Sequence, residues 1–138
     1  MGYIVHESEL ERLSSERAGR ERVFFVNESL SGTDEFLAGI LNYLPGVESP
    51  YHFHRGCEHF QYILEGRGVV VTEDGETPVG PGTLIFVHEN EKHQVKSLEG
   101  RLKFLEFQIP NRFKTTILDG EDTDLRWFHE DGRVFKQS

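Results

Sequence analysis

The sequence of 138 residues has little of several features that mark particular protein classes. It contains one cysteine, Cys57, so no disulfide bond can form within the chain. Lys and Arg number 15 against 24 Asp and Glu, and the formal net charge is −9. Binding to a phosphate backbone needs a basic surface, and no cluster of Lys and Arg occurs, so we expect no nucleic-acid partner.

Long hydrophobic runs are also missing from the sequence. No apolar stretch approaches the roughly 20 residues that span a bilayer, and the first residues lack the pattern of a signal peptide. We therefore expect a cytoplasmic protein without a membrane partner. The length is that of a single domain, and a chain of this size can bury one core.

What the sequence does contain is a series of short apolar runs separated by Gly and Pro. This pattern predicts an all-β sandwich or barrel. We expect a barrel over residues 21–110, an N-terminal arm over 1–20, and a C-terminal tail over 111–138 that packs on the barrel or on a partner subunit. The arm is either flexible or a short helix from Ser8 to Leu13. The expected strands are 23–26, 35–44, 59–64, 68–72, 83–87, 94–97 and 102–109, with a loop over 28–34.

Histidines are the most distinctive polar residues of the predicted barrel. His52 and His54 are two residues apart, so on a strand their side chains share one face. His59 follows after a short polar turn, and His93 comes after a later apolar run. Neutral imidazole is a common ligand of transition metals. If these four side chains converge, they form a metal site. We expect a small-molecule substrate to bind at this site.

The spacing around the first three histidines resembles the first motif of the cupin family. Gly46 is followed after five residues by His52-x-His54, after four more by His59, and after six more by Gly66. The third ligand of this motif is usually Glu, whereas this sequence has histidine there.

A second stretch is similar to the second cupin motif. Gly82 is followed after five residues by His88-x-Asn90, and after two more by His93. Here His88 stands where Pro is usual, Asn90 where Gly is usual, and Ser97 where Asn is frequent.

The resemblance implies a double-stranded β-helix, the cupin jelly roll, with one mononuclear metal centre. The implied ligands are His52, His54, His59 and His93, a set that resembles the four-histidine manganese cupins. It further implies one divalent transition metal per chain, with manganese or iron favoured and zinc, nickel or copper as alternatives.

Glu58 is an alternative third ligand, because it fits the motif if three residues follow His54. Adjacent strand residues point in opposite directions, so Glu58 and His59 cannot both face inward. Only His59 leaves six residues before Gly66. We therefore favour His59 and keep Glu58 as the reserve ligand.

Alternation along the strands also predicts which residues line a substrate pocket. Counting from His59 places Gln61 and Ile63 on the inner face, where Gln61 could contact a substrate or a metal ligand. His88 is a candidate general base or, alternatively, a turn residue at the rim of the barrel.

The strand 102–109 is expected to add an apolar wall to this pocket. We expect Leu105 and Phe107 to face the cavity, with Phe104, Glu106 and Gln108 on the opposite side. A wall of this kind suits an apolar or aromatic substrate.

The resemblance implies a metal-dependent enzyme, of the dioxygenase type, that oxidises a small organic molecule. The alternatives are a non-oxidative isomerase, lyase or cyclase that uses the metal as a Lewis acid, and a non-catalytic cupin that only binds a small molecule.

We also expect a homodimer, because a lone barrel has sheet edges to protect. The expected interface is the N-terminal strand or the tail, which offer Phe24, Phe25, Trp127 and Phe128 as apolar cover.

Overall fold

The computed structural model describes residues 2–136, and their regular structure is almost entirely β. This confirms the expected all-β class. The helical segments of this part of the chain are η1 (Glu7–Glu9), α1 (Glu28–Ser31) and η2 (Asp122–Leu125). No described helix has the length and apolar character that crossing a membrane requires. The strands are β1 (Leu13–Ser15), β2 (Arg20–Val26), β3 (Leu37–Tyr43), β4 (His52–Arg55), β5 (Glu58–Glu65), β6 (Gly68–Thr72), β7 (Gly75–Val79), β8 (Leu84–Val87), β9 (Gln94–Ser97), β10 (Leu102–Ile109), β11 (Lys114–Ile117) and β12 (Trp127–Phe128).

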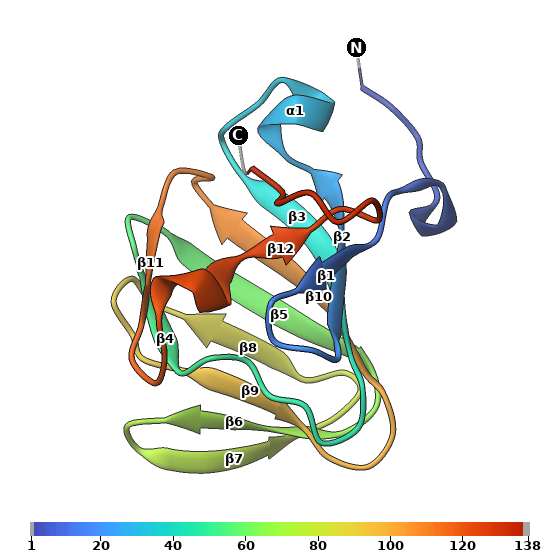
Figure 1. The fold of residues 1–138 in the computed structure, drawn as a ribbon. Helices are drawn as coiled ribbons and strands as arrows, with labels where there is room; N and C mark the ends of the chain where they lie inside the picture. Colours follow the sequence, from blue (N-terminus) through green and yellow to red (C-terminus); the bar gives the residue numbers. More distant parts are fainter. Residues whose placement is uncertain (1, 137–138) are drawn as a thin grey trace.

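The strands form three antiparallel sheets that enclose a common interior (Figure 1). The largest sheet has the order β12-β1-β2-β3-β10-β5-β8, and smaller sheets pair β7-β6-β9 and β11-β4. An isolated bridge between His52 and His93 links β4 to the residue just before β9. The result is the double-stranded β-helix that the resemblance to the cupin motifs implies.

The strand β3 lies in the middle of the large sheet, between β2 and β10. Nearly all of its side chains are buried, which explains why its sequence is a continuous apolar run and not an alternating one. Gly39 allows the close approach of β2, because a Cβ atom there would lie 2.4 Å from the carbonyl oxygen of Val23.

The main core fills the interior between the large sheet and the β7-β6-β9 sheet. It combines side chains from six strands: Leu41, Tyr43, Ile63, Val70, Val79, Val95, Leu102 and Phe104. A smaller group of Leu13, Phe24 and Leu37 packs near the chain ends against Trp127 and Phe135. The apolar core therefore occupies one part of the barrel and leaves another part for polar side chains.

The first and last segments of the chain add strands to the barrel. β1 pairs with both β2 and β12, and β11 pairs with β4 so that Thr115 lies opposite His54. The helix suggested for Ser8 to Leu13 is not present. The segment instead forms η1, which His6 caps by accepting a hydrogen bond from the backbone N–H of Ser8, and then the strand β1.

A short helix, α1, replaces part of the loop expected over 28–34. The Asn27 side chain accepts a hydrogen bond from the N–H of Leu30, and Gly32 ends the helix with a positive φ of 77°. Asn before the first turn and Gly after the last are ordinary helix-end signals, so the sequence did contain the evidence for this turn.

Candidate metal centre

Two neighbouring segments of backbone bring three histidines together. β4 directs His52 and His54 into the barrel, and the backbones of His52 and His93 exchange hydrogen bonds of 3.0 and 2.9 Å. One ring nitrogen from each of His52, His54 and His93 can be chosen so that all three lie within 4.8 Å of one another. These three side chains can therefore hold one metal ion, as expected.

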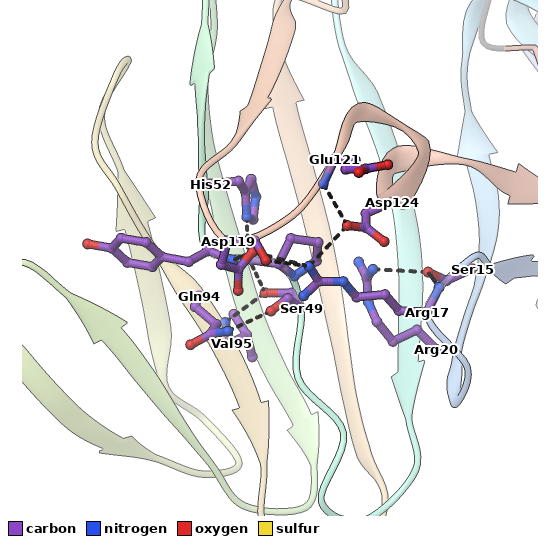
Figure 2. Close-up of polar contacts among 12 residues, drawn as sticks. Ser15, Arg17, Arg20, Ser49, His52, Gln94, Val95, Asp119, Glu121 and Asp124 are labelled. Carbon is purple, nitrogen blue, oxygen red and sulfur yellow. Dashed lines mark hydrogen bonds and ion pairs between the residues drawn. The ribbon is translucent and has the colours of Figure 1, made fainter.

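Hydrogen bonds orient the three rings so that the same nitrogen of each is left for a metal. His52 Nδ1 lies 2.7 Å from the carbonyl oxygen of Pro50, and His93 Nδ1 lies 2.9 Å from that of Glu91 (Figure 2 shows His52). Carbonyl oxygens only accept, so both Nδ1 atoms carry the proton and both Nε2 atoms keep a free lone pair. His54 Nδ1 lies 2.7 Å from the hydroxyl of Thr115, which also leaves Nε2 as the nitrogen outside this contact.

His59 is the fourth histidine at this place. Its ring centre lies 4.9 Å from those of both His54 and His93, and the residue is 2% exposed. Neither of its ring nitrogens has a hydrogen-bond partner, and His93 Nε2 is likewise buried and unpartnered. Buried polar atoms without partners are costly, so they indicate a missing ligand. Three of the four predicted ligands, His52, His54 and His93, therefore form the group that can hold a metal ion, and His59 lies beside them as a fourth candidate.

The pKa values of these histidines favour the neutral form that binds metal. Burial lowers the pKa of His59 to about 4, and burial together with the neighbouring imidazoles lowers the pKa of His54 further. Burial also lowers the pKa of His52 and of His93. At neutral pH the four rings are therefore uncharged, which is the form that binds metal.

These shifts predict that the metal-free protein loses stability in mild acid. Each histidine binds a proton more weakly in the folded chain than in the unfolded chain, whose pKa is about 6.5. Stability should therefore fall as the pH decreases from about 6.5 towards 4, by up to about 1.4 kcal/mol per pH unit for each such group. Thermal melting of chelator-treated protein between pH 7 and 5 measures this. His59→Gln should flatten the slope, and a melting temperature independent of pH would contradict the prediction.

The reserve ligand, Glu58, points away from the cluster. Its carboxylate lies 2.8 Å from His88 Nδ1, and the two side chains are 54% and 71% exposed. His88 does not line the cavity, so its suggested role as a general base is not supported and the alternative, a residue at the rim, fits its position. On a regular strand only one of two adjacent residues can face inward, and here that residue is His59.

Metal affinity should distinguish these two neighbours. Losing a residue that only supports a metal ligand typically weakens metal binding by about 10–100-fold. We expect a larger loss of affinity for His59→Ala and little change for Glu58→Gln. Competition with a chromophoric chelator gives both affinities. A larger loss for Glu58→Gln would mean that the carboxylate is the ligand.

A cavity of about 430 Å³ opens beside the histidine cluster. Strands β2, β5 and β10 contribute charged and amide side chains to its wall. Aromatic and apolar groups of β3, β9 and the tail complete it. Of the four clustered histidines, His52 and His54 line the cavity, and the wall also includes Arg20, Arg22, Tyr43, Gln61, Glu106 and Trp127.

The prediction that Leu105 and Phe107 of strand 102–109 line the pocket is wrong. Phe104, Glu106 and Gln108 are buried, whereas Leu105 and Phe107 lie on the outer face of the barrel. Lys103, Leu105 and Phe107 share one face because they are two residues apart, and Lys103 pairs on that face with Glu7 of η1. The apolar identity of Leu105 and Phe107 had suggested the opposite face.

Of the two residues predicted from β5, only Gln61 lines the cavity. Ile63 does face inward, but it is 1% exposed within the main core and does not reach the cavity. The Gln61 amide donates a hydrogen bond of 3.0 Å to Glu106, and its own oxygen is buried without a partner.

Sequence reasoning missed a buried ion pair in the same wall. Arg22 and Glu106 are 3.2 Å apart, and both side chains are about one-tenth exposed. Burial raises the pKa of Glu106, but Arg22, His59 and the hydrogen bond from Gln61 outweigh it and hold the pKa below its usual value. Arg20 and Arg22 are two residues apart and share one face of β2. We expected this strand to begin only at residue 23, so both arginines fell outside the predicted strand.

Comparison with solved structures finds the same fold. A cupin-superfamily sugar phosphate isomerase from Silicibacter pomeroyi DSS-3 is 18% identical, with a TM-score of 0.74 over 97% of both chains. The polyketide cyclase RemF from Streptomyces resistomycificus is 22% identical, with a TM-score of 0.75 over 90% of both chains. A predicted oxalate decarboxylase from Thermotoga maritima is 26% identical, with a TM-score of 0.69 over 78% of this chain and 99% of the other.

Comparison with curated proteins finds no match. Comparison with protein families matches residues 39–107, half of the chain, to the cupin domain. The matched segment runs from the centre of β3 to β10 and contains all four histidines of the cluster. Together with the fold, this match shows that the chain belongs to the cupin superfamily.

Proposed function

We propose that this cupin is a metal-dependent enzyme that carries out non-oxidative chemistry, of the isomerase, cyclase or lyase type, on a small organic substrate. The observation that carries the proposal is a buried set of charged and amide groups in the cavity wall. Arg22, Glu106 and Gln61 line the cavity and are joined to one another by hydrogen bonds. Such groups suit a substrate rich in oxygen atoms better than an apolar one.

The metal would supply Lewis-acid polarisation of a substrate oxygen. The chain's own residues would orient that substrate. Arg22 keeps Glu106 ionised and fixed, and Gln61 donates to the second oxygen of the same carboxylate. The free oxygen of Gln61 is then available to accept a hydrogen bond from a substrate hydroxyl.

A dioxygenase, the activity first expected, is the second candidate. Ligands that are all histidine leave the charge of a metal uncompensated and, in octahedral geometry, leave positions for both substrate and dioxygen. Strand β10 adds no apolar side chains to the cavity, because Leu105 and Phe107 face outward, and the apolar part of the wall that could protect reactive intermediates comes from β3, β9 and the tail. The three structural neighbours are named as an isomerase, a cyclase and a predicted decarboxylase, which also favours the non-oxidative class.

Proton exchange tests the proposal without knowledge of the natural substrate. Protein loaded with manganese, iron or zinc is incubated in D₂O with a panel of small keto and hydroxy acids and keto sugars, under nitrogen and under air. We expect loss of a C–H proton signal beside the carbonyl in proton NMR under both gases. His52→Ala is the inactive variant, and His88→Ala is the matched control. Turnover that occurs only with consumption of oxygen would assign the dioxygenase activity instead.

We further propose that the protein is a homodimer, through a different face from the one first expected. Phe24 is buried in its own chain against Phe135, and Trp127 packs on both core groups. The outer face of β10, β5 and β8 instead carries two cross-strand rows of apolar side chains, Leu105–Tyr62–Leu84 and Phe107–Phe60–Phe86. A twofold axis would bring two such faces together and bury their apolar side chains.

Light scattering at micromolar concentration should therefore give the mass of two chains. Leu84 and Phe86 are 60% and 50% exposed, and replacing both with Glu should give the mass of one. Leu118→Glu, at a residue 45% exposed outside this face, is the control and should stay dimeric. A single-chain mass for the unaltered protein would contradict the homodimer.

A further inference from the structure

One buried arginine of the cavity, Arg20, has no carboxylate that balances its charge. It is the first residue of β2, it lines the cavity, and it is 9% exposed. Within residues 2–136, no Asp or Glu forms an ion pair with it. Arg22, on the same face of β2, differs because Glu106 neutralises it. Burial of an unpaired charge is unfavourable, so binding of an anion beside Arg20 would be favourable.

The surroundings of Arg20 hold its guanidinium in place without neutralising it. Nη1 donates a hydrogen bond of 3.1 Å to the hydroxyl of Ser15 (Figure 2). The guanidinium carbon lies 5.2 Å from the ring centre of Tyr43 and 4.9 Å from that of Trp127. These cation–π contacts stabilise the charge and fix its orientation. The Nε atom is buried and has no hydrogen-bond partner.

Arg20 also lies close enough to the histidine cluster to act on the same ligand. Arg20 and His52 line the same cavity. Besides Glu106, which pairs with Arg22, two carboxylates line the cavity, and neither cancels the charge of Arg20. Asp124 pairs with Arg17 at 3.3 Å, and Asp122 is exposed (Figure 2 shows Arg17 and Asp124). A ligand in the cavity would thus meet a fixed positive charge at Arg20.

We propose that Arg20 binds an anionic oxygen group of the substrate, a carboxylate or a phosphate, while other oxygens of the same molecule face the histidine cluster. Guanidinium offers paired N–H donors that match both groups. A volume of about 430 Å³ accommodates a small metabolite and not a polymer. The substrate class is then a small organic anion, and this identification rests on the proposed function because it assigns the same cavity.

Calorimetric titration with two anions, pyruvate and inorganic phosphate, tests the role of Arg20. Each is titrated into metal-loaded protein and into chelator-treated protein, so that a contribution from the metal is measured separately. The variants are Arg20→Gln, which removes the charge, and Arg20→Lys, which keeps the charge but loses the paired donors. Arg126→Gln, at an exposed arginine paired with Glu16, is the matched control.

We expect at least one of the two anions to bind, and Arg20→Gln to weaken that binding by about ten- to a hundredfold in both forms of the protein. Arg20→Lys should be intermediate and Arg126→Gln unchanged. If Arg20→Gln does not fold, a loss of affinity in Arg20→Lys makes the same test. Equal affinity in the Arg20 variants and the unaltered protein, or no binding of either anion, would overturn the proposal. The two proposals can also be separated. If anion binding depends on Arg20 but the protein exchanges no substrate protons, the role of Arg20 is upheld and the proposed enzymatic function fails.

Discussion

Replacing His52 or His93 with Ala is expected to reduce the metal content from about one ion per chain to nearly none. Their ring centres lie 4.2 Å apart at the bridge that joins β4 to the start of β9, and each Nδ1 is held by a carbonyl. A metal bound here would lose a ligand that the backbone orients and that no neighbouring side chain replaces. Elemental analysis of protein purified from cells, after dialysis against a mild chelator, measures the content.

His88→Ala is the matched control for this experiment. His88 belongs to the same motif stretch as His93, but its side chain is 71% exposed and bonds to Glu58 on the outside of the barrel. Its removal should leave the metal content unchanged. Full metal content in both His52→Ala and His93→Ala would refute the site, whereas a loss in all three variants would indicate a general effect on folding.

Arg22→Met should lower the free energy of unfolding by about 3–5 kcal/mol, the usual cost of breaking a buried ion pair by removing one partner. Arg22 is 8% and Glu106 is 7% exposed, and the variant would leave the Glu106 carboxylate with only the hydrogen bond from Gln61. Burial would then raise the pKa of Glu106, because Arg22 is the largest of the effects that lower it. Urea denaturation at neutral pH measures the loss.

Two further variants show whether the loss comes from the unpaired charge. Arg126→Met removes an arginine whose pair with Glu16 is about half exposed, and it should cost less than about 1 kcal/mol. The double variant Arg22→Met, Glu106→Leu removes both charges and should recover much of the stability that Arg22→Met loses. A double variant no more stable than Arg22→Met would mean that packing, and not charge, explains the effect.

The fold class and the place of the metal site follow from local features of the sequence. Short apolar runs between Gly and Pro determine strands, and spacing by two determines that His52 and His54 share a face. The choice of His59 over Glu58 also rests on spacing, and the structure buries His59 and exposes Glu58. These features depend only on residues close together in the sequence, so they can be predicted without the tertiary structure.

The remainder of the site was decided by tertiary structure. Alternation shows that Leu105 and Glu106 lie on opposite faces of β10, but not which face is inside, because that depends on how the sheet curves around its interior. The expectation that apolar side chains face inward placed Leu105 inside the barrel, which was wrong. Glu106 is the inward residue, because Arg22, 84 positions earlier in the chain, stabilises its charge there. Arg20 likewise gains its setting from Ser15, Tyr43 and Trp127, which only the paired strands bring together. A buried charge is possible only where distant partners meet it, and such partners leave no pattern in the local sequence.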